Sequence, residues 1–273
     1  MCKKYFFILV ILFSVYTAVC QDSIRIILEF KMVHVVDTTQ ASNPRITQCM
    51  LLAGSKRSIF DDYYRSLKYL GIRGLATDRI YDDPYDIQDA MNGITSDVIY
   101  TDFEKQELIT GSYFWNTLYA KSDPFSNIDW TIQAQKKQIL DQECQLATAI
   151  FKGRHYSAWF APGIPINAGP WKLNGLPGII LAANDDKNEI SFTCTKLTVP
   201  EKNVPTIVLP KNATLISTEK FEKTKKAFIK DPKAGLALSD PRGTLMAITV
   251  APGTTTSQIK PKRRSLNNPI EKE

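Results

Sequence analysis

The chain has 273 residues and a formal net charge of +6, from 34 basic and 28 acidic side chains, and 44% of its residues are hydrophobic. Lys3 and Lys4 lie in an N-terminal leader, and residues 254–273 carry a net charge of +3, so the body of the chain is nearly neutral. A nucleic-acid partner is therefore not expected, because such proteins present a positively charged stripe on their folded surface.

Residues 1–20 have the pattern of a secretory signal peptide. Two lysines precede an apolar run over residues 5–15, and small side chains precede the Cys20–Gln21 bond. The run is shorter than the roughly 20 residues that a membrane-spanning helix needs. We therefore expect cleavage after Cys20 and export to the periplasm, the outer membrane or the medium, with no transmembrane helix in the mature chain. Lipidation of Cys20 is the alternative, although residues 17–19 lack the leucine that is usual in lipoprotein signals.

After the leader, the hydrophobic pattern is mostly the two-residue alternation of β-strands. Residues 24–33 predict the opening strand, residues 46–60 a second strand region, and residues 61–92 a partly helical insertion. Further strands are predicted over residues 98–103, 108–120, 130–135, 143–151, 156–160, 179–183 and 190–199. We predict a mainly β (α+β) fold, with one domain over residues 21–253. Its core is a curled antiparallel sheet, of which a half-open barrel is one form.

A C-terminal helix is predicted over residues 217–230. Ser217 or Thr218 can cap this helix, and Glu219 suits its positive end. Residues 254–273 are polar and basic and offer little apolar surface to bury, so we predict a flexible basic tail there.

Three cysteines follow the leader, namely Cys49, Cys144 and Cys194. Export to an oxidising compartment permits one disulfide among them. Cys144 and Cys194 both lie in predicted strands and are the pair that we favour. The sequence does not decide among the three pairings, and buried free thiols are an equally serious alternative.

Residues 153–181 are the most informative segment, because they combine turn-forming residues with aromatic side chains. Their glycines accept a positive φ at low steric cost, and their prolines fix φ near −65°. The residues concerned are Gly163, Gly169, Gly175, Gly178, Pro162, Pro165, Pro170 and Pro177. We predict a rigid connection between two neighbouring strands. Trp159, Phe160 and Trp171 then lie near one another, either as a plug of the core or as an aromatic ligand platform.

The segment over residues 130–191 resembles the GLPGLI family of secreted proteins from Gram-negative envelopes. The hexapeptide that names the family stands here as Gly175-Leu176-Pro177-Gly178-Ile179-Ile180. Upstream, the resemblance includes residues 144–154, Ala158-Trp159-Phe160 and Gly169-Pro170, whereas His155 and Ala161 depart from the family pattern. The resemblance implies an exported protein and names no catalyst, because the biochemical role of this family is not established.

The sequence contains no recognisable catalytic or metal-binding pattern. Its two histidines, His34 and His155, belong to no metalloprotease or hydrolase motif. His155 and Ser157 lie two residues apart on one strand face and could form a base and a nucleophile, but an exposed strand pair is far commoner. Acidic clusters at residues 82–89 and 185–189 lack the spacing of a calcium loop. We expect no enzyme activity, no cofactor and no metal.

The expected function is binding. A curled sheet whose concave face carries Ile26, Leu28 and Phe30 could hold a lipid, an acyl chain or an apolar peptide segment, by analogy with envelope carriers. The alternative is an assembly partner of an outer-membrane transporter or secretion component, and a hydrolase ranks third. The oligomeric state is left open. The predicted ligand- or partner-binding residues are Arg154, Trp159, Phe160, Pro170, Trp171, Gly175, Leu176, Pro177 and Gly178.

Overall fold

The computed structural model describes residues 22–71, 97–114, 117–201, 204–210, 213–231 and 267–272. The predicted signal peptide lies outside these ranges. So do the part of the predicted helical insertion that follows residue 71 and most of the predicted basic tail.

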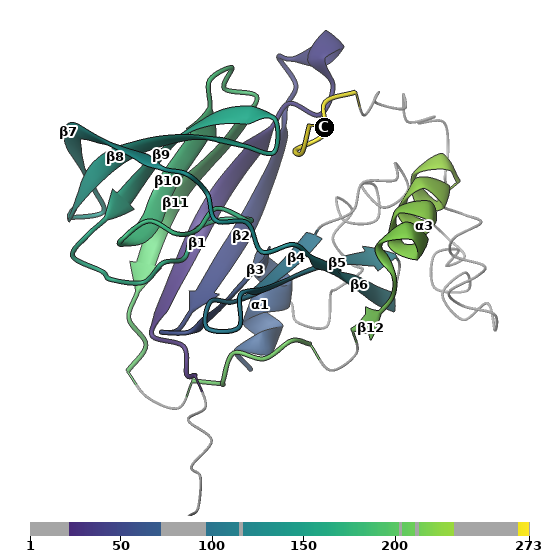
Figure 1. Cartoon of the computed structure of the whole chain (residues 1–273), viewed down its shortest axis with the longest axis horizontal. Helices are drawn as coiled ribbons and strands as arrows, with labels where there is room; N and C mark the ends of the chain where they lie inside the picture. Colours follow the sequence, from purple (N-terminus) through teal and green to yellow (C-terminus); the bar gives the residue numbers. More distant parts are fainter. Residues whose placement is uncertain are drawn as a thin grey trace, which may run out of the picture.

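The described residues form one twelve-stranded sheet in the order β12-β6-β5-β4-β3-β2-β1-β11-β10-β9-β8-β7. The strands are β1 Ile26–His34, β2 Arg45–Ala53, β3 Arg57–Asp62, β4 Asp97–Asp102, β5 Glu107–Phe114, β6 Thr117–Asp123, β7 Thr131–Ile139, β8 Gln142–Phe151, β9 Arg154–Ala161, β10 Ile179–Asp185, β11 Ile190–Thr198 and β12 Thr214–Leu215. Neighbouring strands pair antiparallel, apart from the short parallel pair of β12 and β6. The sheet is curled and not closed, as Figure 1 shows, which confirms the predicted fold class.

The alternation of apolar residues explains why the opening strand forms where it does. In β1 the side chains of Ile26, Leu28 and Phe30 are at most 2% exposed, whereas the residues between them are half-buried. Two predicted runs are each divided between two strands. The run at residues 46–60 falls on β2 and β3, with residues 54–56 between them, and the described part of the run at residues 108–120 falls on β5 and β6.

The strands in the middle of the sheet are buried on both faces. On β2, Leu51 belongs to the cluster on one face, and its neighbours Met50 and Leu52 belong to the cluster on the other. The first cluster, here called the interior cluster, also contains the alternating apolar residues of β1. The second cluster is covered by Leu67 from helix α1 (Tyr63–Tyr69) and by Ile207. Chain from outside the sheet therefore covers the face opposite the interior cluster.

The C-terminal helix α3 (Thr218–Lys230) forms at the predicted position. The Ser217 hydroxyl accepts a hydrogen bond from the Lys220 amide, which is the N-cap that the sequence indicates. Phe221 and Phe228 are buried against Phe114 of β5, with ring centroids 6.0 and 5.3 Å away. This aromatic cluster fastens the helix to one end of the sheet, beside β6 and β12 (Figure 1).

The last described residues differ from the predicted tail. Residues 267–272, here called the C-terminal segment, lie against the sheet, and Asn268 is only 3% exposed. The prediction of a flexible tail is therefore wrong for these residues. Polar contacts to distant parts of the chain hold them, and composition does not reveal such contacts.

Candidate functional site

The Gly- and Pro-rich segment at residues 162–178, here called the motif loop, connects two strands that are neighbours in the sheet. Strand β9 leads into the loop, β10 leaves it, and the two strands pair antiparallel. The loop runs back along the start of β10, where the Ile179 amide donates to the Ile164 carbonyl (3.0 Å) and the Ile180 amide donates to the Ala168 carbonyl (3.0 Å). The predicted connection between neighbouring strands is therefore present.

Two glycines of the motif loop are required for different reasons. Gly175 has a φ of +91°, which lies in the region that residues with side chains rarely adopt. Gly178 lies so close to β9 that a Cβ atom there would be 2.3 Å from the Ala161 carbonyl oxygen. The first glycine permits a turn, and the second permits close contact between backbones.

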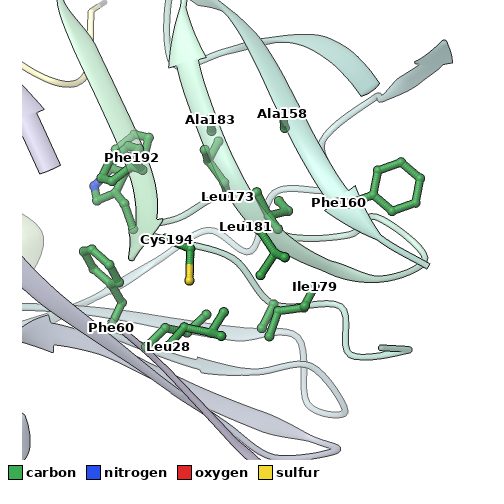
Figure 2. Packing of buried hydrophobic residues seen from close by; sticks show 14 of the residues in the cluster. Leu28, Phe60, Ala158, Phe160, Leu173, Ile179, Leu181, Ala183, Phe192 and Cys194 are labelled. Carbon is green, nitrogen blue, oxygen red and sulfur yellow. The ribbon is translucent and has the colours of Figure 1, made fainter. Parts of the chain in front are cut away.

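The motif loop fills the concave side of the sheet with apolar side chains. Leu173 and Leu176 are each 1% exposed and belong to the interior cluster together with Leu28 of β1. Figure 2 shows Leu173 among side chains from several strands, including Leu28, Phe60 and Leu181. The residues that the sequence places on an apolar binding face are thus already covered by side chains of the same chain.

The aromatic residues Trp159, Phe160 and Trp171 do not form one exposed platform. Phe160 and Trp171 are 1% and 5% exposed and lie in the interior cluster. Trp171 has a φ of +54° and contacts Phe151 edge-on, with ring centroids 5.7 Å apart. Trp159 is only half-buried, and the Lys137 ammonium lies 4.2 Å from the centre of its ring. The rings therefore mainly plug the core, and Trp159 alone reaches the surface.

The two prolines among the predicted site residues differ in exposure. Pro170 is buried beside Trp171, and Pro177 is exposed between the buried Leu176 and the tightly packed Gly178.

Arg154, the first residue of β9, is the centre of a buried polar cluster. Its Nη1 atom donates to Asp185 Oδ2 (2.5 Å) and to Glu189 Oε2 (2.9 Å). Its other nitrogens donate to the C-terminal segment: Nη2 to Asn268 Oδ1 and to the Pro269 carbonyl (each 2.7 Å), and Nε to the Ile270 carbonyl (3.1 Å). A guanidinium has five N–H donors, so the two carboxylates and the segment use all of them.

The C-terminal segment also bonds to the end of β1. The Asn268 side-chain amide donates to the Val35 carbonyl (2.6 Å), and its backbone amide donates to the Val36 carbonyl (3.2 Å). His34 Nε2 lies 2.8 Å from the Asn268 carbonyl oxygen and must carry the hydrogen, because a carbonyl only accepts. Burial lowers the pKa of His34 to about 4, so the imidazole is neutral at neutral pH.

A second buried cation, Lys172 of the motif loop, holds the same segment. Its ammonium group lies 2.6 Å from Glu271 Oε1 and 2.6 Å from Asp123 Oδ2. Burial acts to lower the pKa of Lys172, but the carboxylates of Glu271 and Asp123 outweigh burial and the pKa is raised. Arg154 of β9 and Lys172 of the motif loop therefore direct two positive charges at the C-terminal segment.

Tyr156 lies in the core next to this cluster. Its side chain is 1% exposed and packs on Trp171, with ring centroids 6.4 Å apart. Burial raises the pKa of the phenol, and its hydroxyl has no hydrogen-bond partner among the described residues.

An open depression lies on the outward side of β8 and β9, opposite the motif loop. Its volume is about 440 Å³. Thr131, Thr148 and Ser157 form one row across β7, β8 and β9, since each is register partner of the next. His155, Ile150, Asp129 and Asp186 complete most of the lining, and the Ile150 side chain is 67% exposed. The depression is therefore mainly polar, with one apolar side chain at its margin.

The depression does not contain a formed catalytic pair. His155 and Ser157 face the same side, but no hydrogen bond joins them in the described part of the chain, and two residues of strand separate their Cα atoms by about 6.6 Å. Among the described residues, no group of three or more His, Cys, Asp or Glu side chains is arranged to hold a metal ion. Asp185 and Glu189 of the acidic cluster instead bind Arg154, and the cluster at residues 82–89 lies outside the described residues.

The cysteines differ from the predicted pairing. Cys49, Cys144 and Cys194 are all free and buried, so the structure does not contain the Cys144–Cys194 disulfide. The two residues lie on β8 and β11, which are separated in the sheet by β9 and β10. Strands in that relation do not bring Cα atoms as close as the roughly 4.4–6.8 Å that a disulfide needs.

Arg154 was predicted as a site residue, but the contacts around it were not. Asn268, which bonds to Arg154, was not predicted to contribute, and neither were Lys172 and His34, which bond to the C-terminal segment. These contacts join parts of the chain that are far apart in sequence. The one local signal was Ile270, an apolar residue that follows Asn268-Pro269 in an otherwise polar tail and packs against the interior cluster.

Comparison with known proteins agrees with the fold and assigns no activity. A family model described as "Protein of unknown function (Porph_ging)" matches residues 150–182, which include Arg154, the motif loop and Lys172. The match lies within residues 130–191, the segment from which the GLPGLI family was predicted, and it shows a related family of unknown function. No curated protein matches the chain. Of the described helices, none is long and apolar enough to cross a membrane.

Three solved structures match this chain at low sequence identity. Two structures of PNGF-II, from different space groups, match with TM-scores of 0.52 and 0.51 and with 12% and 11% identity. The matches cover 76% and 74% of this chain but only 33% of the PNGF-II chain in each case. An uncharacterized conserved protein from Thermus thermophilus gives a TM-score of 0.36 at 7% identity, covering 70% of this chain and 89% of that one. The similarity to PNGF-II concerns the fold alone.

Proposed function

We propose that this chain is an exported, non-enzymatic envelope protein of the GLPGLI type that acts by binding another protein. The observation that carries the proposal is the filled concave side of the sheet. Ile26, Leu28 and Phe30, the residues expected to line an apolar groove, are 2%, 0% and 0% exposed beneath the motif loop.

A lipid or acyl-chain carrier is less well supported for the same reason. An apolar ligand on the concave face would have to displace Leu173, Leu176 and Trp171 from the interior cluster. Removing large side chains from a packed core costs about 2–5 kcal/mol each. An apolar segment of a partner protein would meet the same obstacle there, so the partner is expected on the outward side.

The depression on β8 and β9 is the surface that suits such a partner. It offers a row of hydroxyls, two carboxylates and an exposed isoleucine, and interfaces between separately stable proteins are about as polar as the rest of the protein surface. Trp159 lies further along the same face of β9, and tryptophan is enriched among the residues that contribute most to binding at protein interfaces.

Site-specific photo-crosslinking in the native envelope tests this proposal. A photoreactive amino acid at Thr148 should give a defined adduct with one protein. The same photoreactive amino acid in place of Glu143, which is exposed on β8 outside the depression, should give no adduct. Equal labelling from both positions, or no adduct from Thr148, would count against the proposal.

Two further measurements separate the alternatives. Stoichiometric uptake of a fluorescent fatty acid by delipidated protein would favour the carrier. Hydrolase turnover that His155→Ala abolishes would favour the enzyme.

A further inference from the structure

The C-terminal segment is held as a peptide ligand is held. It has neither helix nor strand of its own, and its contacts reach three separate parts of the chain. These are the end of β1, the β8–β9 turn with Arg154, and the motif loop at Lys172. Residues 232–266 separate it in sequence from the nearest described residue, Asp231.

The receiving surface fixes both the direction and the register of the segment. Backbone groups are bound at each end: the Asn268 amide donates to the Val36 carbonyl, and the Lys272 amide donates to the Lys152 carbonyl (2.9 Å). Between these points, Arg154 donates to two successive carbonyls, those of Pro269 and Ile270. Main-chain hydrogen bonds of this kind supply affinity that does not depend on side chains.

Side chains of the segment supply specificity. The side-chain amide of Asn268 accepts a hydrogen bond from Arg154 and donates one to the Val35 carbonyl. Ile270 packs on the interior cluster, and Glu271 pairs with Lys172. The order Asn-Pro-apolar-acidic is therefore recognised position by position.

The β8–β9 turn has a shape that admits this segment. A Cβ atom on Gly153 would lie 2.7 Å from Lys272 Cβ and 2.7 Å from the Lys272 carbonyl oxygen. Any side chain at residue 153 would collide with the backbone of the segment. This close approach is an observation independent of the polar contacts.

We infer that the surface formed by Arg154, His34 and Lys172 is a peptide-binding site, that residues 267–272 occupy it as an intramolecular ligand, and that it accepts a peptide with the order Asn-Pro-apolar-acidic from another chain. This site is distinct from the depression on β8 and β9. A ligand that belongs to the same chain competes with a free peptide at an effective concentration that can reach roughly millimolar. The segment in its own chain must therefore be weakened before a peptide in trans binds well.

The test uses the full chain and a fluorescent peptide spanning residues 266–273. Asn268→Ala in the protein removes two side-chain hydrogen bonds of the attached segment and leaves the receiving surface unchanged. This variant is expected to bind the peptide at least tenfold more tightly than the wild-type chain does. A peptide carrying the same Asn268→Ala change should bind the variant protein at least tenfold more weakly than the native peptide does. This comparison tests recognition of the peptide with the same protein in both measurements.

Equal binding of the peptide by wild-type and variant protein, or equal binding of the two peptides by the variant, overturns the inference. Circular dichroism and thermal unfolding show whether the Asn268→Ala chain is folded. If it is not, Glu271→Gln is the second releasing variant, because it weakens the ion pair with Lys172 and preserves the shape of the side chain. Crosslinking from Thr148 does not depend on the outcome, so this inference and the proposed function fail separately.

Discussion

Replacing Gly178 by alanine introduces a methyl group where there is no room for it. The new Cβ atom would lie 2.3 Å from the Ala161 carbonyl oxygen, 2.7 Å from the Ala161 carbonyl carbon and 2.9 Å from Pro162 Cα. All three are backbone atoms, so no side chain can rotate away to relieve the contact. The backbone of β9 or of the motif loop must move instead, and such overpacking in a well-packed region costs about 1–3 kcal/mol.

Gly163→Ala is the matched control in the same loop. No atom outside its immediate neighbours lies within 4 Å of a Cβ at residue 163, and its φ is not positive, so alanine should change the free energy of unfolding by less than about 0.5 kcal/mol. Gly175→Ala separates sterics from backbone strain, since its Cβ meets nothing within 4 Å but its φ is +91°. That strain should cost about 1–2 kcal/mol.

Urea unfolding followed by tryptophan fluorescence measures all three variants. The expected order of destabilisation is Gly178→Ala, then Gly175→Ala, then Gly163→Ala, with similar dependence on urea concentration. If Gly178→Ala is as stable as Gly163→Ala, the motif loop does not pack on β9 as described. In that case the motif loop would not fill the concave side of the sheet.

Three further predictions concern other contacts. Asp22 is buried, and its carboxylate accepts hydrogen bonds from the amides of Ser55, Lys56 and Arg57 at 2.7–3.0 Å. Asp22→Ala leaves these donors unpaired and should lower the free energy of unfolding by about 2–3 kcal/mol, seen as a lower urea midpoint; an unchanged midpoint would contradict these contacts. The pKa of His34 is about 4 in the folded chain and 6.5 in the unfolded chain, so the folded state binds fewer protons between these values. The free energy of unfolding should therefore fall by up to about 3 kcal/mol as the pH drops from about 6.5 to 4. His34→Gln should lose this part of the pH dependence, and an unaltered stability profile would refute the assignment. Burial raises the pKa of Cys49 and Cys194 to about 12, so alkylation mapped by mass spectrometry should modify both thiols only after unfolding. If Cys194 resists alkylation in the unfolded, unreduced chain, it forms a disulfide and the assignment of free thiols is wrong.

The parts of the fold that depend on local patterns were predictable. Alternating apolar residues place β1, and the Ser217 cap places α3, because both signals are contained within a few residues. The arrangement of the strands was not predictable in this way. Strand β1 pairs with β11, whose residues follow it by more than 150 positions, and no local pattern encodes that pairing.

In the candidate site, too, the features set by local sequence were predictable and the long-range contacts were not. The glycines and prolines of the motif indicate a rigid connection, because their backbone preferences are intrinsic. The docking of the C-terminal segment depends on buried charges at Arg154 and Lys172, and each gains its partners only in the folded chain. A tail rich in polar residues offers too little apolar surface to predict order, so charge pairing outweighs composition here.

Native mass spectrometry of the gently purified protein tests most directly whether the sheet is filled by its own chain. We expect the mass of the polypeptide without lipid, since Leu173, Leu176 and Trp171 occupy the concave side. A stoichiometric lipid adduct that persists on gentle activation and is lost when the protein is unfolded would contradict it.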